Sequence, residues 1–331
     1  MKVSVIIPAY NAHKTLSRCL ASIMIQSIVE DLEVIVVDDC STDGGYEKEI
    51  STFRPFMNIR EITLEKNGGP GVARQAGIDE STAPFFTCID ADDTFSGAYA
   101  LECLVKYLDN PGVNMVSSVF VEVHEEDKEK NIEQVFLPHQ NDIVWMFGKM
   151  YKRTFIEANK IRFNETRANE DNGFNCKVRL CGLEGSIVYI DDITYYWHDN
   201  PNSITRINNC QYSYDQSFVG YVDNMIDAIE HCKRINPFNS QVTQHAYEVM
   251  FNLYTYYLEV EQRDPRFLEQ ALKYCRKYYQ QIYCKLEELD QSVISSLYAK
   301  SLMPKYAGPI PQWHDIFPNI LFKDFIELLK K

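Results

Sequence analysis

The sequence has no apolar run that approaches the ~20 consecutive residues of a membrane-spanning helix. The apolar stretch in MKVSVIIPAYN is short and stops at Pro8, so we expect no secretory leader there. The ten cysteines include no C-x-x-C pair, which gives no sign of a zinc ribbon or a disulfide framework. We therefore expect reduced thiols and a cytoplasmic protein, one that can also act at the inner face of the membrane.

Positive charge is also scarce. The chain has 33 Lys and Arg against 47 Asp and Glu, and the net charge of −14 disfavours nucleic acid and anionic lipid as partners. From Asn209 onward there are 13 basic and 15 acidic residues, a difference of −2, so −12 of the charge lies before that position. The acidic excess therefore belongs to the first two-thirds of the chain.

Short apolar runs alternate with helical patterns in the first part of the chain, which predicts an α/β fold with a largely parallel sheet. The expected strands are 3–8, 32–37, 58–64 and 84–89, and the expected helices are 14–28, 72–81 and 99–108. Such sheets bind ligands beyond the carboxyl ends of their strands. Polar loops follow all four strands, so we expect the functional site at that edge.

The pattern becomes more varied after residue 110. We expect a strand at 113–123, then a charged segment at 124–134 that is either a solvated hairpin tip or a mobile loop. The remaining expected elements are a strand and short helix in 145–165, a helix in 169–182 and strand-like runs in 186–198. From about residue 209 the apolar spacing is helical, which predicts an all-helical domain at 209–331 after a first domain at 1–208.

Two features of the expected helical domain have two interpretations each. The tyrosine-rich stretches YTYY and KYYQQIY either form a core between helices or stack on sugars. The amphipathic segment LFKDFIELLKK either docks on neighbouring helices or lies on a membrane surface.

Seven segments, in this order, resemble the signature of family 2 glycosyltransferases of the GT-A fold, which transfer sugars with inversion. The segments are VSVIIPAYNAHKTLSRCLASIMIQS, EVIVVDDCSTDGG, NGGPGVARQAGI, IDADD, FGKMYKRTFIEANKIRFNE, NEDNGFN and YYWHDNPNSIT. They cover roughly residues 2–207, and nothing beyond about residue 210 contributes to the resemblance. It implies a GT-A catalytic domain, with a Rossmann-like and mostly parallel central sheet, that binds a nucleotide sugar.

The acidic cluster IDADDTF is costly in itself, because like charges this close resist being ionised together. Aspartates in turns or at helix N-caps are one explanation. The resemblance implies another, in which Asp90-Ala91-Asp92 is the D-x-D motif. Asp90 then lies near the donor ribose, and Asp92 holds the Mn²⁺ or Mg²⁺ that bridges the diphosphate. Asp93 would orient its neighbours or cap the next helix, while His198 either completes the metal shell, contacts a phosphate or is structural.

The resemblance also implies a nucleotide site on three further loops. Asp39, which follows Asp38, would accept from a uracil N–H, and the ring of Tyr10 would stack on the base. Arg74 would reach the base, ribose or a phosphate, next to glycines that allow close backbone approach. The residues assigned to the nucleotide are Pro8, Ala9, Tyr10, Asn11, Asp39, Asn67, Gly68, Arg74, Asp90 and Ala91. The alternatives are an ordinary turn for Asp39, edge packing for Tyr10 and a surface charge for Arg74.

Glu170 and Asp171 match the family's general-base position, with Asp171 as the expected base and Glu170 as the reserve. The alternative is that they cap the helix that follows. Lys149 either helps to line the acceptor side or is solvated. Ser203 and Arg206 are expected near the diphosphate.

We therefore expect a metal-dependent transferase that moves a sugar from a UDP-sugar to a saccharide or lipid-linked glycan in surface polysaccharide synthesis. A transferase acting on protein or phage DNA is an alternative, as is a non-catalytic protein that binds nucleotide or glycan. A same-fold nucleotidyltransferase would usually carry a glycine-rich loop after the first strand, where this chain has PAYN.

Overall fold

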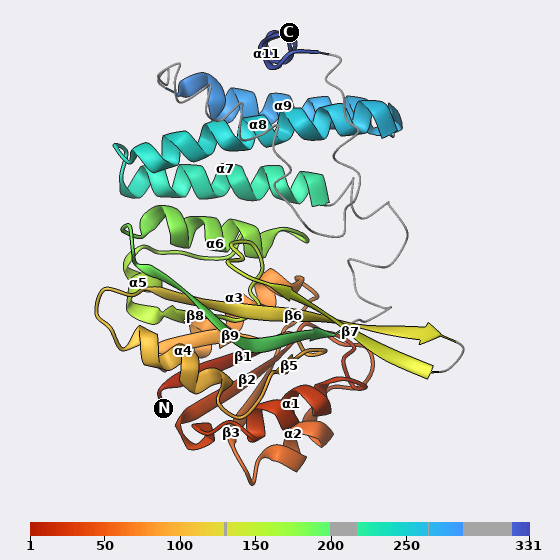
Figure 1. Ribbon diagram of the computed structural model, residues 1–331, viewed down its shortest axis with the longest axis vertical. Helices are drawn as coiled ribbons and strands as arrows, with labels where there is room; N and C mark the ends of the chain where they lie inside the picture. Colours follow the sequence, from red (N-terminus) through yellow and green to blue (C-terminus); the bar gives the residue numbers. More distant parts are fainter. Residues whose placement is uncertain (129–130, 199–216, 264, 287–319) are drawn as a thin grey trace. The chain divides into compact units, whose positions relative to one another are not determined.

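The structure is a computed structural model that describes residues 1–128, 131–198, 217–263, 265–286 and 320–331. The chain divides into two compact units, Met1–Asn209 and Cys210–Lys331. The first is mixed α/β, and the described part of the second is helical (Figure 1).

Unit 1 is built on a single sheet, as far as its described residues go. Its strands are β1 (Val3–Ala9), β2 (Leu32–Asp38), β3 (Asn58–Thr63), β4 (Phe85–Cys88), β5 (Thr94–Phe95), β6 (Met115–Lys128), β7 (Asn131–His139), β8 (Lys149–Lys152) and β9 (Ile187–His198). Their order is β3-β2-β1-β4-β8-β6-β9-β5, and β7 pairs with residues 120–128 of β6. The pairs among β3, β2, β1 and β4 are parallel, as expected. The strand β8 joins β4 and β6 in antiparallel fashion, and β9 runs parallel to β6.

Helices cover both faces of this sheet, which explains why its strands are apolar on both sides. They are α1 (Leu16–Met24), α2 (Glu47–Phe53), α3 (Pro70–Glu80), α4 (Ala100–Leu108), α5 (Arg153–Ala158) and α6 (Glu170–Cys181), with a 3-10 turn, η1, at Val29–Asp31. Val5 and Ile7 of β1 pack into the same core as α1, α2 and α4, whereas Ile6 packs into the core shared with α3, α5 and α6.

The close approach of α3 to the sheet depends on Gly77. A Cβ atom at this position would overlap the side chain of Ile6 on β1 and come within 3.1 Å of Val37 on β2. The backbone of α3 therefore lies directly on the two central strands, and its first turn begins at their carboxyl edge. This packing places Arg74, on the same helix, beside the loops that follow the strands.

Three details of unit 1 differ from the sequence pattern or decide between its alternatives. The short helix α2 was not expected, and the two strand-like runs at 186–198 form the single strand β9. The charged segment at 124–134 belongs to a hairpin, because β6 and β7 pair as far as Lys128 and Asn131. That result favours the hairpin over the mobile loop.

The described helices of unit 2 are α7 (Phe218–Ile235), α8 (Ser240–Arg263), α9 (Leu268–Gln281) and α11 (Phe322–Leu329), with 3-10 turns η3 (Pro265–Phe267) and η4 (Tyr283–Lys285). Two tyrosines of YTYY, Tyr254 and Tyr257, are buried core residues. Phe325 of α11 is fully buried, and its ring lies 5.4 Å from Tyr254 and 5.1 Å from Tyr257. This packing favours the docking interpretation of the last segment over the membrane interpretation.

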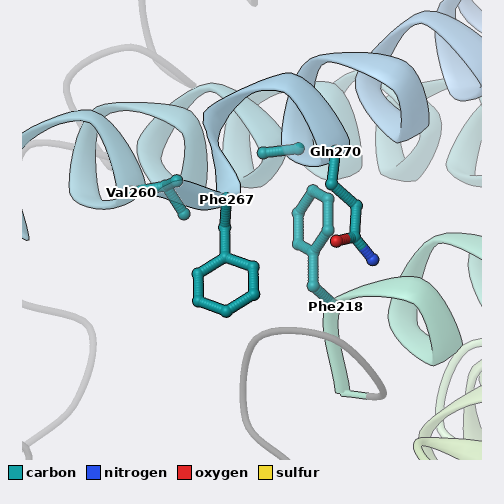
Figure 2. Close-up of a pocket in the computed structure, with 5 residues that line it drawn as sticks. Phe218, Val260, Phe267 and Gln270 are labelled. Carbon is teal, nitrogen blue, oxygen red and sulfur yellow. The ribbon is translucent and has the colours of Figure 1, made fainter. Parts of the chain in front are cut away.

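One hollow among the described helices is too small for a ligand, and no membrane span is found among them. The hollow lined by Phe218, Val260, Phe267, Gln270 and Ala271 has a volume of only about 10 Å³, at the lower limit for one water molecule (Figure 2). None of the helices in the described ranges combines the length and apolarity needed to cross a bilayer.

Candidate active site

The loop after β2 is tied to the glycine-rich loop before α3 through Asp39. The two carboxylate oxygens of Asp39 accept hydrogen bonds from the backbone N–H groups of Gly68 and Gly69, at 2.7 and 2.8 Å. Gly69 has φ +89°, which L side chains rarely adopt. Burial raises the pKa of Asp39, although these two bonds oppose the shift. Each oxygen keeps a lone pair, so Asp39 can still accept from a ligand.

The loop after β1 contains an exposed aromatic residue, Tyr10. Pro8 and Ala9 are buried strand residues, whereas Tyr10 is 48% exposed. Asn11 has φ 52°, and its side-chain oxygen accepts from the N–H of Thr42 at 2.8 Å. Asn11 therefore fixes the loop after β2, and the neighbouring Tyr10 remains exposed to solvent.

Arg74 is an internal bridge between two of the expected motifs. It is only 4% exposed, which excludes the surface-charge alternative. One terminal nitrogen donates to Asp90 Oδ1 and the other to Glu170 Oε1, both at 2.8 Å. Gly71, one turn earlier on α3, leaves room for the side chain of Glu170. A Cβ atom at Gly71 would lie only 2.7 Å from Glu170 Cγ. The acidic cluster and Glu170, which directly precedes the expected base Asp171, are thus joined through one guanidinium group.

The three carboxylates of the acidic cluster lie close together. Carboxylate oxygens of Asp90, Asp92 and Asp93 lie within 4.8 Å of one another. Asp93 is fully buried and accepts from the hydroxyl of Tyr195 at 2.6 Å and from the backbone N–H of His198 at 2.8 Å. Burial raises the pKa of Asp93 well above its usual range, and the charges of Asp92 and Asp90 add to the shift. Tyr195 and His198 therefore hold Asp93 in place, while Asp90 and Asp92 are only partly buried.

These donors fit a hard divalent cation, because all of them are carboxylate oxygens. His198 is not part of the group whose ligand atoms lie within 4.8 Å. Its Nε2 lies 2.9 Å from the hydroxyl of Thr94. Burial, with help from the charge of Arg18, lowers the pKa of His198 to about 4, so the imidazole is neutral at physiological pH.

Glu170 and Asp171 open α6, and both are buried. Glu170 is occupied by Arg74, whereas Asp171 accepts from the backbone N–H of Asn172 at 2.7 Å. Burial and the neighbouring charge of Glu170 raise the pKa of Asp171 to about 8, against a smaller opposing effect of Arg74. A raised pKa makes the deprotonated carboxylate of Asp171 a stronger base than an ordinary aspartate, so Asp171 is a candidate proton acceptor.

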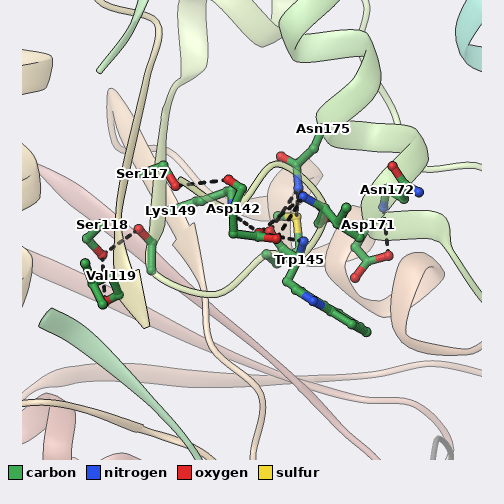
Figure 3. A network of polar contacts seen from close by, with 12 residues as sticks. Ser117, Ser118, Val119, Asp142, Trp145, Lys149, Asp171, Asn172 and Asn175 are labelled. Carbon is green, nitrogen blue, oxygen red and sulfur yellow. Dashed lines mark hydrogen bonds and ion pairs between the residues drawn. The ribbon is translucent and has the colours of Figure 1, made fainter. Parts of the chain in front are cut away.

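A polar network behind Asp171 was not visible in the sequence (Figure 3). Lys149 is completely buried and forms an ion pair with Asp142, with 2.6 Å between Nζ and Oδ2. Asp142 also accepts from the N–H of Trp145 at 2.9 Å, and Asn175 of α6 donates to the carbonyl of Trp145 at 3.0 Å. Lys149 is therefore neither solvated nor exposed toward an acceptor. No spacing rule links Lys149 to Asp142, so sequence reasoning had no signal for this pair.

Direct contacts thus form two groups of expected site residues. Asp39 contacts Gly68 and accepts from Asn67 through its carbonyl at 3.0 Å, and Arg74 contacts Asp90 of the acidic cluster. Ser203 and Arg206 lie outside the described residues.

Comparison with known proteins finds similar sequences among glycosyltransferases and proteins of polysaccharide biosynthesis. The family model "Glycosyl transferase family 2" matches residues 4–168. Succinoglycan biosynthesis protein ExoO of Rhizobium meliloti is 28% identical over 223 residues, which are 62% of this chain and 63% of that protein. Poly(ribitol-phosphate) beta-N-acetylglucosaminyltransferase TarS of Staphylococcus aureus is 30% identical over 212 residues, which are 60% of this chain and 35% of TarS. The chain therefore spans between about one-third and two-thirds of the length of these relatives.

Solved structures share the fold. TarS residues 1–349 in complex with UDP-GlcNAc superpose with a TM-score of 0.66 at 20% identity, covering 84% of this chain and 81% of that one. A mannosyltransferase from Pyrobaculum calidifontis, in complex with GDP-Man and Mn²⁺, gives a TM-score of 0.51 at 17% identity, covering 99% and 86%. The expected GT-A fold is confirmed, and the chain belongs to glycosyl transferase family 2.

Proposed function

We propose that the protein is a metal-dependent, inverting glycosyltransferase that uses a UDP-sugar as donor. The observation that carries this proposal is the bridge from Asp90 through Arg74 to Glu170, which holds the D-x-D motif beside the candidate base Asp171. In this proposal residues 1–208 form the catalytic domain and 209–331 an accessory helical domain.

The donor site that we propose lies on the loops after β1, β2 and β4. Asp39 accepts the uracil N–H with its remaining lone pairs, and the exposed ring of Tyr10 stacks on the base. Pro8, Ala9, Asn11, Asn67 and Gly68 shape the backbone around the nucleotide. The complex of TarS with UDP-GlcNAc supports the choice of a uridine nucleotide, because TarS has the same fold.

Asp92, with Asp90 beside it, would hold Mn²⁺ or Mg²⁺ against the diphosphate. A bound cation supplies positive charge at the diphosphate, which makes UDP a better leaving group. Arg74 keeps Asp90 in place, and Asp93 is fixed by Tyr195 and His198. His198 is a neutral imidazole whose Nε2 contacts Thr94, so in this proposal its Nδ1 serves the metal shell or a phosphate.

Asp171 is the general base of the reaction that we propose. It takes the proton of the acceptor hydroxyl while that oxygen attacks the anomeric carbon, and the bond from this carbon to the diphosphate breaks. A single displacement of this kind inverts the anomeric centre. Glu170 holds Arg74 and does not take the proton.

For the biological role, we propose transfer to a saccharide or lipid-linked glycan during synthesis of a surface polysaccharide, in the cytoplasm or at the inner face of the membrane. The relatives support this proposal, since ExoO is named for succinoglycan biosynthesis and TarS for modification of poly(ribitol-phosphate).

A thermal-unfolding series tests the donor and metal sites together. UDP should raise the melting temperature appreciably with Mn²⁺ present and little in EDTA, because ligands that bind only the folded state stabilise it by mass action. Asp92→Ala should abolish this synergy, while Asp79→Ala, at an exposed acidic position on α3, should retain it. Equal stabilisation by UDP in EDTA would show that Asp92 and its neighbours do not act through a cation.

A further inference from the structure

We infer that Trp145 and Trp197 form a platform on which a pyranose ring of the acceptor stacks, so that the acceptor is a neutral saccharide and not a polyol phosphate. This inference rests on the proposed function, because it assigns the acceptor side of the same site. We refer to the two indole rings as the tryptophan platform.

The two rings lie together at the edge of the sheet core. Their centroids are 5.8 Å apart, and Phe147 lies between them and the core, 5.7 Å from Trp145 and 5.4 Å from Trp197. Phe147 is buried, whereas both tryptophans are only partly buried. The platform therefore has an inner layer that fixes its position and an outer part that solvent reaches.

The platform is connected to both halves of the candidate active site. Trp145 is held by Asp142 and by Asn175, which is one helical turn after Asp171 on α6 (Figure 3). Trp197 directly precedes His198, whose backbone N–H donates to Asp93. The indoles thus belong to the segments that also hold the candidate base and the acidic cluster.

A polar group borders the platform on the β6 side. Glu122 is in register with Trp197 on β9, and its side chain is buried. The two oxygens of Glu122 lie 2.9 Å from Nε2 of His124 and 3.4 Å from Nε2 of His139. Aromatic rings beside a few fixed polar groups are the usual lining of a site for a small polar molecule.

The chemistry of this surface favours a sugar ring over a polyol phosphate. A pyranose has flat faces of C–H bonds that pack on an indole, whereas an open polyol chain offers no such face. Residues 1–208 also carry a net charge of −12, so a polymer with a phosphate in every unit is repelled there. The acceptor that we infer therefore differs from the poly(ribitol-phosphate) in the name of TarS.

Tryptophan fluorescence tests this inference directly, because the chain has three tryptophans and Trp313→Phe leaves the two platform residues as the only ones. The full chain with this change is titrated with N,N′-diacetylchitobiose and cellobiose as pyranose probes and with ribitol 5-phosphate as the polyol probe. We expect a saturable change in emission with at least one disaccharide and none with ribitol 5-phosphate. Trp145→Leu and Trp197→Leu should each weaken disaccharide binding at least ~10-fold. Phe56→Leu, at an aromatic residue that is 60% exposed, is the control and should bind like the parent.

The outcomes separate this inference from the proposed function. If UDP stabilises the protein with Mn²⁺ but neither disaccharide changes the emission, or ribitol 5-phosphate alone does, the platform assignment is wrong and the glycosyltransferase proposal stands. If a disaccharide binds the platform but UDP never binds, the platform stands and the transferase proposal fails. Disaccharide binding that both leucine variants retain would overturn the inference, and thermal unfolding of each variant checks that it is folded.

Discussion

Asp171→Asn is expected to slow sugar transfer at least ~100-fold while binding of UDP and Mn²⁺ stays at the parent level. A general base contributes ~10²–10⁴-fold to rate and little to donor affinity. Asparagine keeps the size of the side chain and removes the basic oxygen. The measurement is release of UDP from a UDP-sugar under saturating donor, with the UDP-induced thermal shift recorded in parallel.

Glu170→Gln is the matched control. It changes the adjacent carboxylate in the same way and keeps an oxygen that can accept from Arg74. We expect a milder loss of rate. If Glu170→Gln is the more severe change, Glu170 is the base and Asp171 has another role. If neither change slows UDP release, the base lies elsewhere.

The pKa of Asp171 also gives the expected pH dependence. The folded-state pKa is raised from 3.8 to about 8, so the rate should rise with pH through that region as Asp171 loses its proton. Between these two values the unfolded chain binds fewer protons at this site than the folded chain. Stability therefore falls as pH rises from about 3.8 and levels off above about 8. Asp171→Asn should remove this slope, so the variant should be more stable than the parent at pH 8.

Lys149→Met is expected to lower the free energy of unfolding by about 3–5 kcal/mol, because it leaves the carboxylate of Asp142 without its buried partner. Burial already lowers the pKa of Lys149, and the charge of Asp142 opposes that effect. Urea denaturation at neutral pH measures the change. Lys48→Met, at an exposed position on α2, should stay within about 0.5 kcal/mol of the parent.

The double variant Lys149→Met with Asp142→Asn tests the cause. It removes both charges, so it should be clearly more stable than Lys149→Met alone. A single variant as stable as the parent would show that the buried ion pair contributes nothing to the fold. A double variant no more stable than the single one would assign the loss to packing and not to the unpaired charge.

The parallel part of the sheet was predictable because its strands are short, continuous apolar runs. Helices cover both faces of the sheet, so the residues that point to either face must be apolar. Ile6 and Ile7 point to opposite cores, so both had to be apolar. The helix α2 was missed because only Ile50 and Phe53 of its seven residues are buried, too few to produce a helical stripe. Its position is fixed by packing against α1 and β3 and not by its own pattern.

For the candidate site, the sequence predicted which loops meet but not how their side chains pair. Asp90, Asp92 and Asp93 are neighbours in the chain, so their grouping was visible. The contact from Arg74 to Glu170 joins residues 96 positions apart, and the one from Tyr195 to Asp93 joins residues 102 apart. Such pairs form only when helices and strands are packed, and a single sequence holds no local signal for them.

The most direct test of the central claim is proton NMR of an α-linked UDP-sugar incubated with the protein and Mn²⁺, with water as the acceptor if no other is supplied. The account predicts that UDP is released only with the metal present and that the free sugar appears first as the β-anomer, because a single displacement inverts the anomeric carbon. Release that continues unchanged in EDTA, or first appearance of the α-anomer, would contradict the metal-dependent inverting mechanism.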